Sequence, residues 1–244
     1  MKKPIFVILL LCFAAVIAYS GYRIWLIQDD YNREKQIRDI AMVYKPNVGI
    51  DLGDIQNMES QAEYIVNLSI VDLREAHPDA IGWITIPNTN IDYPFVQSGD
   101  NDYYLHRDIN GDRAAVGSIF MEHNCSSDFS SPNTIIYGHH MKNESMFGTL
   151  KYFNDKTFFE QNEHGFIYLP YENLKLEFFA YMVVSPNDRE IYSVELSDTY
   201  FDYVKQNARY YRELGLAEGD KIVTISTCAY EFDNARMVLL ARVV

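Results

Sequence analysis

The fold and the chemistry of this chain meet in residues 221–244, which read Lys221-Ile-Val-Thr-Ile-Ser-Thr-Cys228-Ala-Tyr-Glu-Phe-Asp-Asn-Ala-Arg236-Met-Val-Leu-Leu-Ala-Arg-Val-Val244. Two apolar runs, 222–226 and 237–243, flank a turn rich in Asp and Asn, and this pattern predicts strand, turn and strand. Cys228 ends the first strand and Arg236 begins the second, so the hairpin would set a thiol opposite a cation. Such a thiol is either an activated nucleophile or a buried structural group.

Short apolar segments separated by turn residues also occur upstream of this hairpin. We expect six further strands, at residues 81–87, 91–96, 116–121, 134–137, 166–169 and 174–184. Strands of this length and spacing indicate a mainly β fold, either a closed barrel or a sandwich. Helical spacing predicts insertions at 146–161 and 198–214, the second of them before the penultimate strand.

The N-terminal segment differs from the rest of the chain. Lys2 and Lys3 precede an apolar run over 5–27, which is long enough to span a bilayer. It is a signal peptide or an uncleaved anchor, and we favour the anchor because apolar character continues past the possible cleavage site at 18–20. The two lysines predict a cytoplasmic N-terminus and an extracellular body at the cell membrane.

Residues 28–78 have helical spacing at 28–44 and 55–76, which predicts a helical hairpin between membrane and strands, although 28–50 could be a plain spacer. The expected organisation is therefore a transmembrane segment at 1–27, a helical region at 28–78 and a β domain at 79–244. After residue 27 the chain has 18 basic and 34 acidic residues, a net charge of 18 − 34 = −16. This charge argues against binding nucleic acid.

Outside the membrane segment only Cys125 and Cys228 remain, so no disulfide framework is present, although the two could pair. His139 and His140 follow Gly138 directly after an apolar strand. If that strand lies beside the hairpin, the cysteine could attack a carbonyl, the histidine could protonate the leaving amine and the arginine could hold the oxyanion.

A metal site is the competing interpretation of the same residue types. The possible ligands are His123, Cys125, His139 and His140. Adjacent histidines rarely bind one ion together, and the chain has no closely spaced cysteine pair. We therefore expect no metal and no cofactor.

Three motifs in order resemble those of the sortases. Thr224-Ile-Ser-Thr-Cys228 resembles the T-L-x-T-C signature, with Ile225 in place of Leu, and Arg236 follows on the next strand. Asn133-Thr-Ile-Ile-Tyr-Gly-His139-His140 resembles the sortase histidine segment. The run over 81–105, the insertion between Tyr181 and Lys221 and the N-terminal helices resemble class B, and the similarity extends over 28–244.

The resemblance implies an eight-stranded β-barrel and a membrane-anchored cysteine transpeptidase of Gram-positive bacteria. Such an enzyme cleaves a C-terminal sorting motif of a secreted protein, of the NPQTN kind in class B. It forms a thioacyl intermediate and transfers the acyl group to an amine of cell-wall peptidoglycan. By position, Cys228 would be the nucleophile, His139 the general acid and base, and Arg236 the oxyanion or substrate clamp.

The resemblance also implies a peptide groove lined by Asn101, Leu105 and Ser226 and flanked by Tyr192. Core packing is the alternative for Leu105 and Tyr192. The backbone N–H of Ala229 could join Arg236 in an oxyanion hole. Three other functions share parts of this pattern: an exported cysteine protease, a non-catalytic wall-binding module and a pilin-polymerising sortase. The last often carries a lid and a hydrophobic C-terminal tail, neither of which we find in this sequence.

Overall fold

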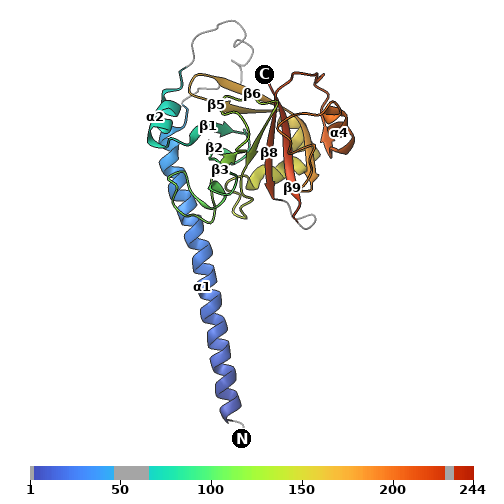
Figure 1. The fold of residues 1–244 in the computed structure, drawn as a ribbon. Helices are drawn as coiled ribbons and strands as arrows, with labels where there is room; N and C mark the ends of the chain where they lie inside the picture. The colour runs from blue at the N-terminus through green and yellow to red at the C-terminus, as the bar shows by residue number, and fades with distance from the viewer. Residues whose placement is uncertain (1–2, 47–65, 229–233) are drawn as a thin grey trace.

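The computed structural model describes residues 3–46, 66–228 and 234–244, and a closed β-barrel dominates these parts of the chain (Figure 1). Eight strands follow one another around the barrel in the order β5, β1, β2, β3, β4, β8, β9, β6, and β6 pairs again with β5. The two-residue β7 adds to β6 outside this ring. The strands are β1 (Ala80–Thr85), β2 (Asp92–Val96), β3 (Ile119–Met121), β4 (Asn133–Tyr137), β5 (His164–Tyr168), β6 (Asn173–Val184), β7 (Tyr210–Tyr211), β8 (Ile222–Cys228) and β9 (Arg236–Val243).

The barrel predicted by the resemblance is confirmed, and all eight predicted strands are present with slightly different ends. Its interior is an apolar cluster to which each of the eight strands contributes. On β8, Val223 and Ile225 belong to this cluster, whereas the alternate residues Thr224 and Ser226 are polar. Because side chains alternate along a strand, the outer face of β8 is left for polar groups.

The N-terminal helix α1 (Lys3–Ala41) is continuous, so the expected transmembrane segment and the first part of the expected helical region belong to one helix. No proline interrupts the sequence from residue 5 to residue 44, and helical spacing therefore continues directly from the apolar run. This helix is long and apolar enough to cross a membrane, with a mean hydropathy of 2.4 in its most apolar window. A 3₁₀ turn, η1 (Met42–Tyr44), follows it.

Within the described residues, the second expected helix, 55–76, is represented by the shorter α2 (Leu68–Ala76). Residues 55–65 lie outside the described residues. Asn67 is non-helical because its backbone N–H donates to the Pro170 carbonyl and its side chain bonds Asn173. The end of α1 and α2 share a buried cluster with β1, which includes Ala41, Leu73 and Trp83.

Both predicted insertions are shorter than expected. The region 146–161 divides into η5 (Gly148–Asn154) and α3 (Lys156–Gln161), because Asp155 is extended and caps α3 by accepting from the Phe158 N–H at 2.9 Å. The region 198–214 contains α4 (Tyr200–Asn207), and the chain then pairs with β6 as β7. A further 3₁₀ turn, η4 (Tyr104–His106), precedes β3.

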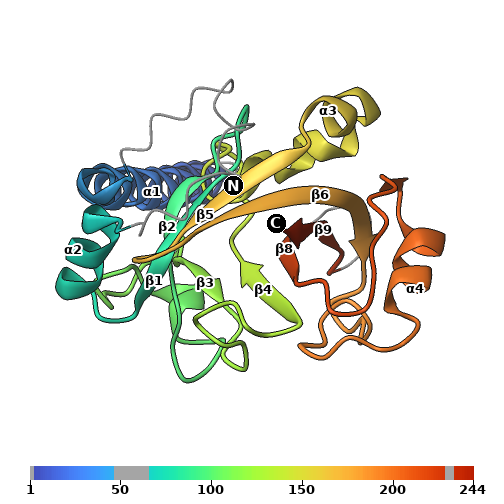
Figure 2. The same cartoon turned by 90° about the horizontal axis from the view of Figure 1, so that it is seen from above.

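The helices lie on opposite sides of the barrel. Figure 2 shows α1 and α2 beside β1 and β2, and α4 at the other side, next to the curved β6. Tyr200 and Val204 of α4 are buried with outward residues of β6 and β9, which form a separate apolar cluster. Between these two covered sides, the outer faces of β3, β4 and β8 form the wall of a groove.

Candidate active site

The strand that leads to His139 lies directly beside the hairpin strand that ends at Cys228. β4 pairs with β8 in parallel register, with Tyr137 opposite Ser226, and the Gly138 N–H continues the ladder to the Ser226 carbonyl at 3.2 Å. His139 and Cys228 are therefore each two residues beyond the same register pair. Cys228 is also the direct partner of Arg236 across the β8–β9 hairpin. A Cys–His–Arg site requires that the strand before His139 lie beside the hairpin, and the pairing of β4 with β8 meets this requirement.

His139 is half-buried and its imidazole has a defined hydrogen bond. Nε2 lies 2.9 Å from the carbonyl oxygen of Leu105. Because a carbonyl oxygen only accepts, Nε2 carries the proton, and Nδ1 of the neutral ring keeps its lone pair for proton transfer. The backbone is held as well, since the Phe147 N–H donates to the His139 carbonyl at 3.0 Å.

The neutral form of His139 is favoured by its surroundings. Burial lowers the pKa of this imidazole below its usual value, and the nearby charges of His106 and Arg236 lower it further, whereas the hydrogen bond to Leu105 raises it. Among the described residues, no carboxylate contributes to this shift. The imidazole is therefore placed to accept a proton, and its protonated form has no anionic partner there.

Arg236 is half-buried at the first position of β9. Its Nη1 donates to the carbonyl oxygens of Asn234 and Ala235, at 3.0 and 3.2 Å. These bonds hold one arm of the guanidinium against the turn and leave the planar fork beside the groove. His139 and Arg236 line the same groove, and the charge of Arg236 is one of the causes that lower the His139 pKa.

All four residues predicted to contact substrate line one groove with His139 and Arg236. The groove has a volume of about 340 Å³, and its wall includes Asn101, Leu105, Tyr192 and Ser226. The Tyr192 hydroxyl and Ser226 Oγ are 2.8 Å apart. Leu105 and Tyr192 also pack against apolar clusters on either side of the groove. Each of them therefore both lines the groove and packs on the core.

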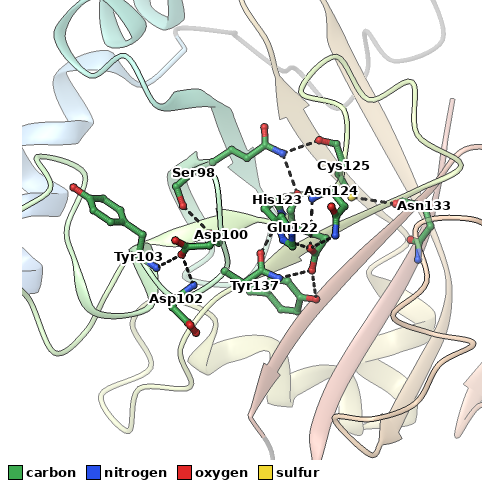
Figure 3. Close-up of polar contacts among 12 residues, drawn as sticks. Ser98, Asp100, Asp102, Tyr103, Glu122, His123, Asn124, Cys125, Asn133 and Tyr137 are labelled. Atoms are coloured by element: carbon green, nitrogen blue, oxygen red, sulfur yellow. Dashed lines mark hydrogen bonds and ion pairs between the residues drawn. The ribbon is translucent and has the colours of Figure 1, made fainter.

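Glu122 is a groove residue that the sequence analysis missed. It follows β3, is 8% exposed and accepts from Asn101 Nδ2 at 2.6 Å and from the Tyr137 hydroxyl at 3.1 Å. Figure 3 shows the Glu122 carboxylate at the centre of this polar network, where it also pairs with the imidazole of His123. The only local signal was a carboxylate that directly follows the apolar run Ile119–Met121.

Two glycines that the sequence analysis also passed over shape the backbone around His139. Gly117 has φ +58°, and a Cβ there would lie 2.5 Å from the Leu105 carbonyl oxygen that holds the imidazole. A Cβ at Gly138 would lie 2.6 Å from the Phe147 ring. Close backbone approach therefore requires glycine at both positions.

The remaining cysteine and histidine candidates are placed as follows. Cys125 is a free, buried thiol that donates to the Asn133 carbonyl, and burial raises its pKa to about 11. His123 pairs with Glu122, and His140 forms a backbone bridge with Met146. Within the described residues, no three His, Cys, Asp or Glu side chains gather as they would around a metal ion. Ala229 lies outside the described residues.

Comparison with known proteins gives consistent similarities. The Sortase domain family profile matches residues 84–244. Sortase B of Listeria monocytogenes is 31% identical over 94% of this chain and 92% of its own length. The structure of sortase B from Bacillus anthracis in complex with AAEK2 superimposes with a TM-score of 0.72, 31% identity and coverage of 88% of this chain and 97% of that one. A class B sortase of Streptococcus pyogenes involved in pilus biogenesis gives a TM-score of 0.67 and 27% identity, covering 71% and 97% of the two chains.

Proposed function

Because the chain belongs to the sortase family and resembles its class B members, we propose that it is a membrane-anchored cysteine transpeptidase with Cys228 as nucleophile, His139 as general acid and base and Arg236 as oxyanion or substrate clamp. The observation that carries this proposal is the parallel register of β4 and β8. It brings His139 and Cys228 to adjacent strand ends, with Arg236 opposite the cysteine. The substrate is the C-terminal sorting motif of a secreted protein, bound in the groove beside these residues.

The reaction proceeds in two acyl transfers. The thiol sulfur attacks the scissile carbonyl and its proton passes to Nδ1 of His139, while the guanidinium of Arg236 stabilises the oxyanion. The imidazolium then protonates the leaving amine, and a thioester remains on Cys228. An amine of peptidoglycan attacks the thioester, His139 takes up the amine proton, and the thiolate leaves and is reprotonated.

The helix α1 supports anchoring of this enzyme at the membrane. Its apolar part is long enough to span a bilayer, and Lys2 and Lys3 precede it, which favours a cytoplasmic N-terminus and a catalytic barrel outside the cell. The enzyme would then encounter both its substrates and the acceptor on the extracellular side. The proposed acceptor is therefore a cell-wall amine.

A peptide-cleavage assay tests the proposal. A library of sorting-motif peptides is incubated with the enzyme with and without a small amine, and products are identified by mass spectrometry. Cleavage with transfer to the amine is expected, and Cys228→Ala should abolish both. Hydrolysis without transfer would instead indicate an exported cysteine protease. Transfer only to a lysine of a folded pilin would favour a role in pilus biogenesis, in which the Streptococcus pyogenes class B sortase is involved.

Thiol reactivity and pH dependence provide two further tests. A thiol-directed peptide probe should label Cys228 but not the buried Cys125, and labelling of neither would favour a binding module. The pH–rate profile should be bell-shaped because turnover needs one proton shared between Cys228 and His139. A profile that is flat between about pH 6 and pH 9 would contradict the assignment.

A further inference from the structure

Glu122 is a buried carboxylate in the groove that the proposed reaction does not use. Its two oxygens are occupied by donors: Asn101 Nδ2 and the Tyr137 hydroxyl at Oε2, and His123 Nδ1 at Oε1, 2.7 Å away. The Gln97 side chain fixes the same loop by donating to the Glu122 carbonyl at 2.9 Å. A carboxylate only accepts hydrogen bonds, so every partner must turn a hydrogen toward it.

The carboxylate thereby determines which atoms the groove presents. Asn101 points its Nδ2 at Glu122, and its Oδ1 accepts from the His123 N–H at 3.0 Å, so the orientation of the amide is fixed. Oδ1 retains a further lone pair. The Tyr137 hydroxyl hydrogen is turned toward Glu122, which leaves the phenol oxygen as an acceptor. Burial, followed by the Glu122 charge, raises the pKa of Tyr137, and the phenol therefore stays protonated.

These groups form one wall of the groove, and the atoms that they present there are hydrogen-bond acceptors. The Tyr137 ring stacks on Tyr192 at a centroid distance of 6.3 Å, and both residues line the groove. β3, β4, β8 and β9 are consecutive neighbours, and three interstrand spacings place the end of β3 about 14 Å from β9. The groove therefore has a negative charge and hydrogen-bond acceptors on the β3 side and the Arg236 cation on the β9 side.

We propose that Glu122 is a positioning residue that makes the β3 side of the groove select a peptide side chain bearing hydrogen-bond donors and reject a carboxylate. This inference rests on the proposed peptide-cleaving function. An amide can donate to Asn101 Oδ1 or the Tyr137 oxygen. A carboxylate has no donor for these acceptors and meets the charge of Glu122.

The test uses peptide pairs that differ only by Gln or Glu, or by Asn or Asp, at one motif position at a time. For the wild type we expect at least one position at which the amide peptide has about tenfold higher kcat/KM, mainly through KM. In Glu122→Gln the charge is lost, and the amide nitrogen of the new side chain faces one of the donors that bind the carboxylate in the wild type. The preference for the amide peptide should therefore fall to within about threefold. Glu122→Asp keeps the charge and should retain the preference, with a raised KM.

Glu160→Gln is the matched control, because Glu160 is an exposed carboxylate on α3 whose ion partner is Lys156. It should keep the full amide preference. A purely structural role of Glu122 would reduce cleavage of both peptides equally and leave their ratio unchanged, and that result would overturn the inference. So would equal kcat/KM for amide and carboxylate peptides in the wild type, which decides the matter even if Glu122→Gln fails to fold. No cleavage of any peptide would instead refute the proposed function.

Discussion

Among single residues, Arg236 has a role that another cation should not replace. One guanidinium arm is bound to two carbonyls of its own turn while the fork lies beside the groove. A lysine is a point charge and cannot make both sets of bonds. The geometry of this one side chain therefore determines how well the oxyanion is held in the proposed reaction.

We expect Arg236→Lys to lower kcat for peptide cleavage by about 10²–10³-fold, the usual cost of losing an oxyanion donor. Steady-state kinetics with a cleavable peptide measures it. The matched control is Arg242→Lys on the same strand, where the arginine binds Glu177 away from the groove. A variant at residue 236 that keeps more than half of the wild-type kcat would show that charge alone is sufficient.

The lowered pKa of His139 also predicts how stability depends on pH. Above the unfolded-state value of about 6.5, neither the folded nor the unfolded chain is protonated at this residue, and its contribution to stability is complete. As the pH falls toward the lower folded value, only the unfolded chain binds a proton, so the free energy of unfolding decreases. Burial lowers the pKa of His164 in the same direction, and its contribution has the same sign.

Urea unfolding at pH 7.5, 6.5 and 5.5 should therefore show a smaller loss of stability on acidification for His139→Gln than for the wild type. His164→Gln should remove the second contribution. If the free energy of unfolding of the wild type and of His139→Gln changed with pH in parallel, the imidazole would titrate alike in the folded and unfolded chains.

At the scale of elements, the junction between β4 and His139 depends on close packing. Gly138 continues the ladder to β8 and lies against the ring of the fully buried Phe147. A methyl group there must displace the ring or the strand, and the strand positions His139. This junction therefore links core packing to the geometry of the site.

Gly138→Ala should lower the free energy of unfolding by about 1–3 kcal/mol and reduce kcat as well. Thermal unfolding and peptide cleavage measure the two effects. The control is Gly99→Ala, because a Cβ at Gly99 would meet no atom within 4 Å. Unchanged kcat in a destabilised Gly138→Ala enzyme would separate the packing from the orientation of His139.

The elements also show what the sequence could predict. The strands were found because β-branched and apolar alternation is a local signal, as in β8 with Val223 and Ile225 inward. The helix ends were missed because tertiary contacts decide them: residues 210–211 pair with β6, and Asn67 is bound to residue 170. Likewise, nothing near Glu122 in the sequence identifies Asn101 and Tyr137 as its partners.

At the scale of the whole molecule, α1 has two parts with different environments. Its first part is apolar and exposed, whereas its end is integrated into the protein. Ala41 is 2% exposed in a cluster with β1 and α2, and buried Glu34 accepts from the Tyr93 hydroxyl of β2 at 3.2 Å. The barrel and the end of this helix should therefore unfold together.

A chain that begins at residue 28 should be soluble and keep wild-type kcat/KM for a free peptide. A chain that begins at residue 46 should unfold at a temperature lower by about 5 °C or more, because it loses the contacts of Ala41 and Glu34. Differential scanning calorimetry and peptide cleavage measure both quantities. Equal melting temperatures of the two shortened chains would show that the end of α1 adds nothing to the fold.

The pairing of β4 with β8 also has a consequence for how the enzyme comes into being. Thr224 of β8 and Asn133 of β4 are hydrogen-bonded across 91 residues of sequence, and closing so long a loop is entropically costly and slow. His139 and Cys228 therefore become neighbours only when most of the barrel has formed. During export and refolding the cysteine would be a thiol without its base, so the newly made chain should gain cleavage activity only at the end of folding.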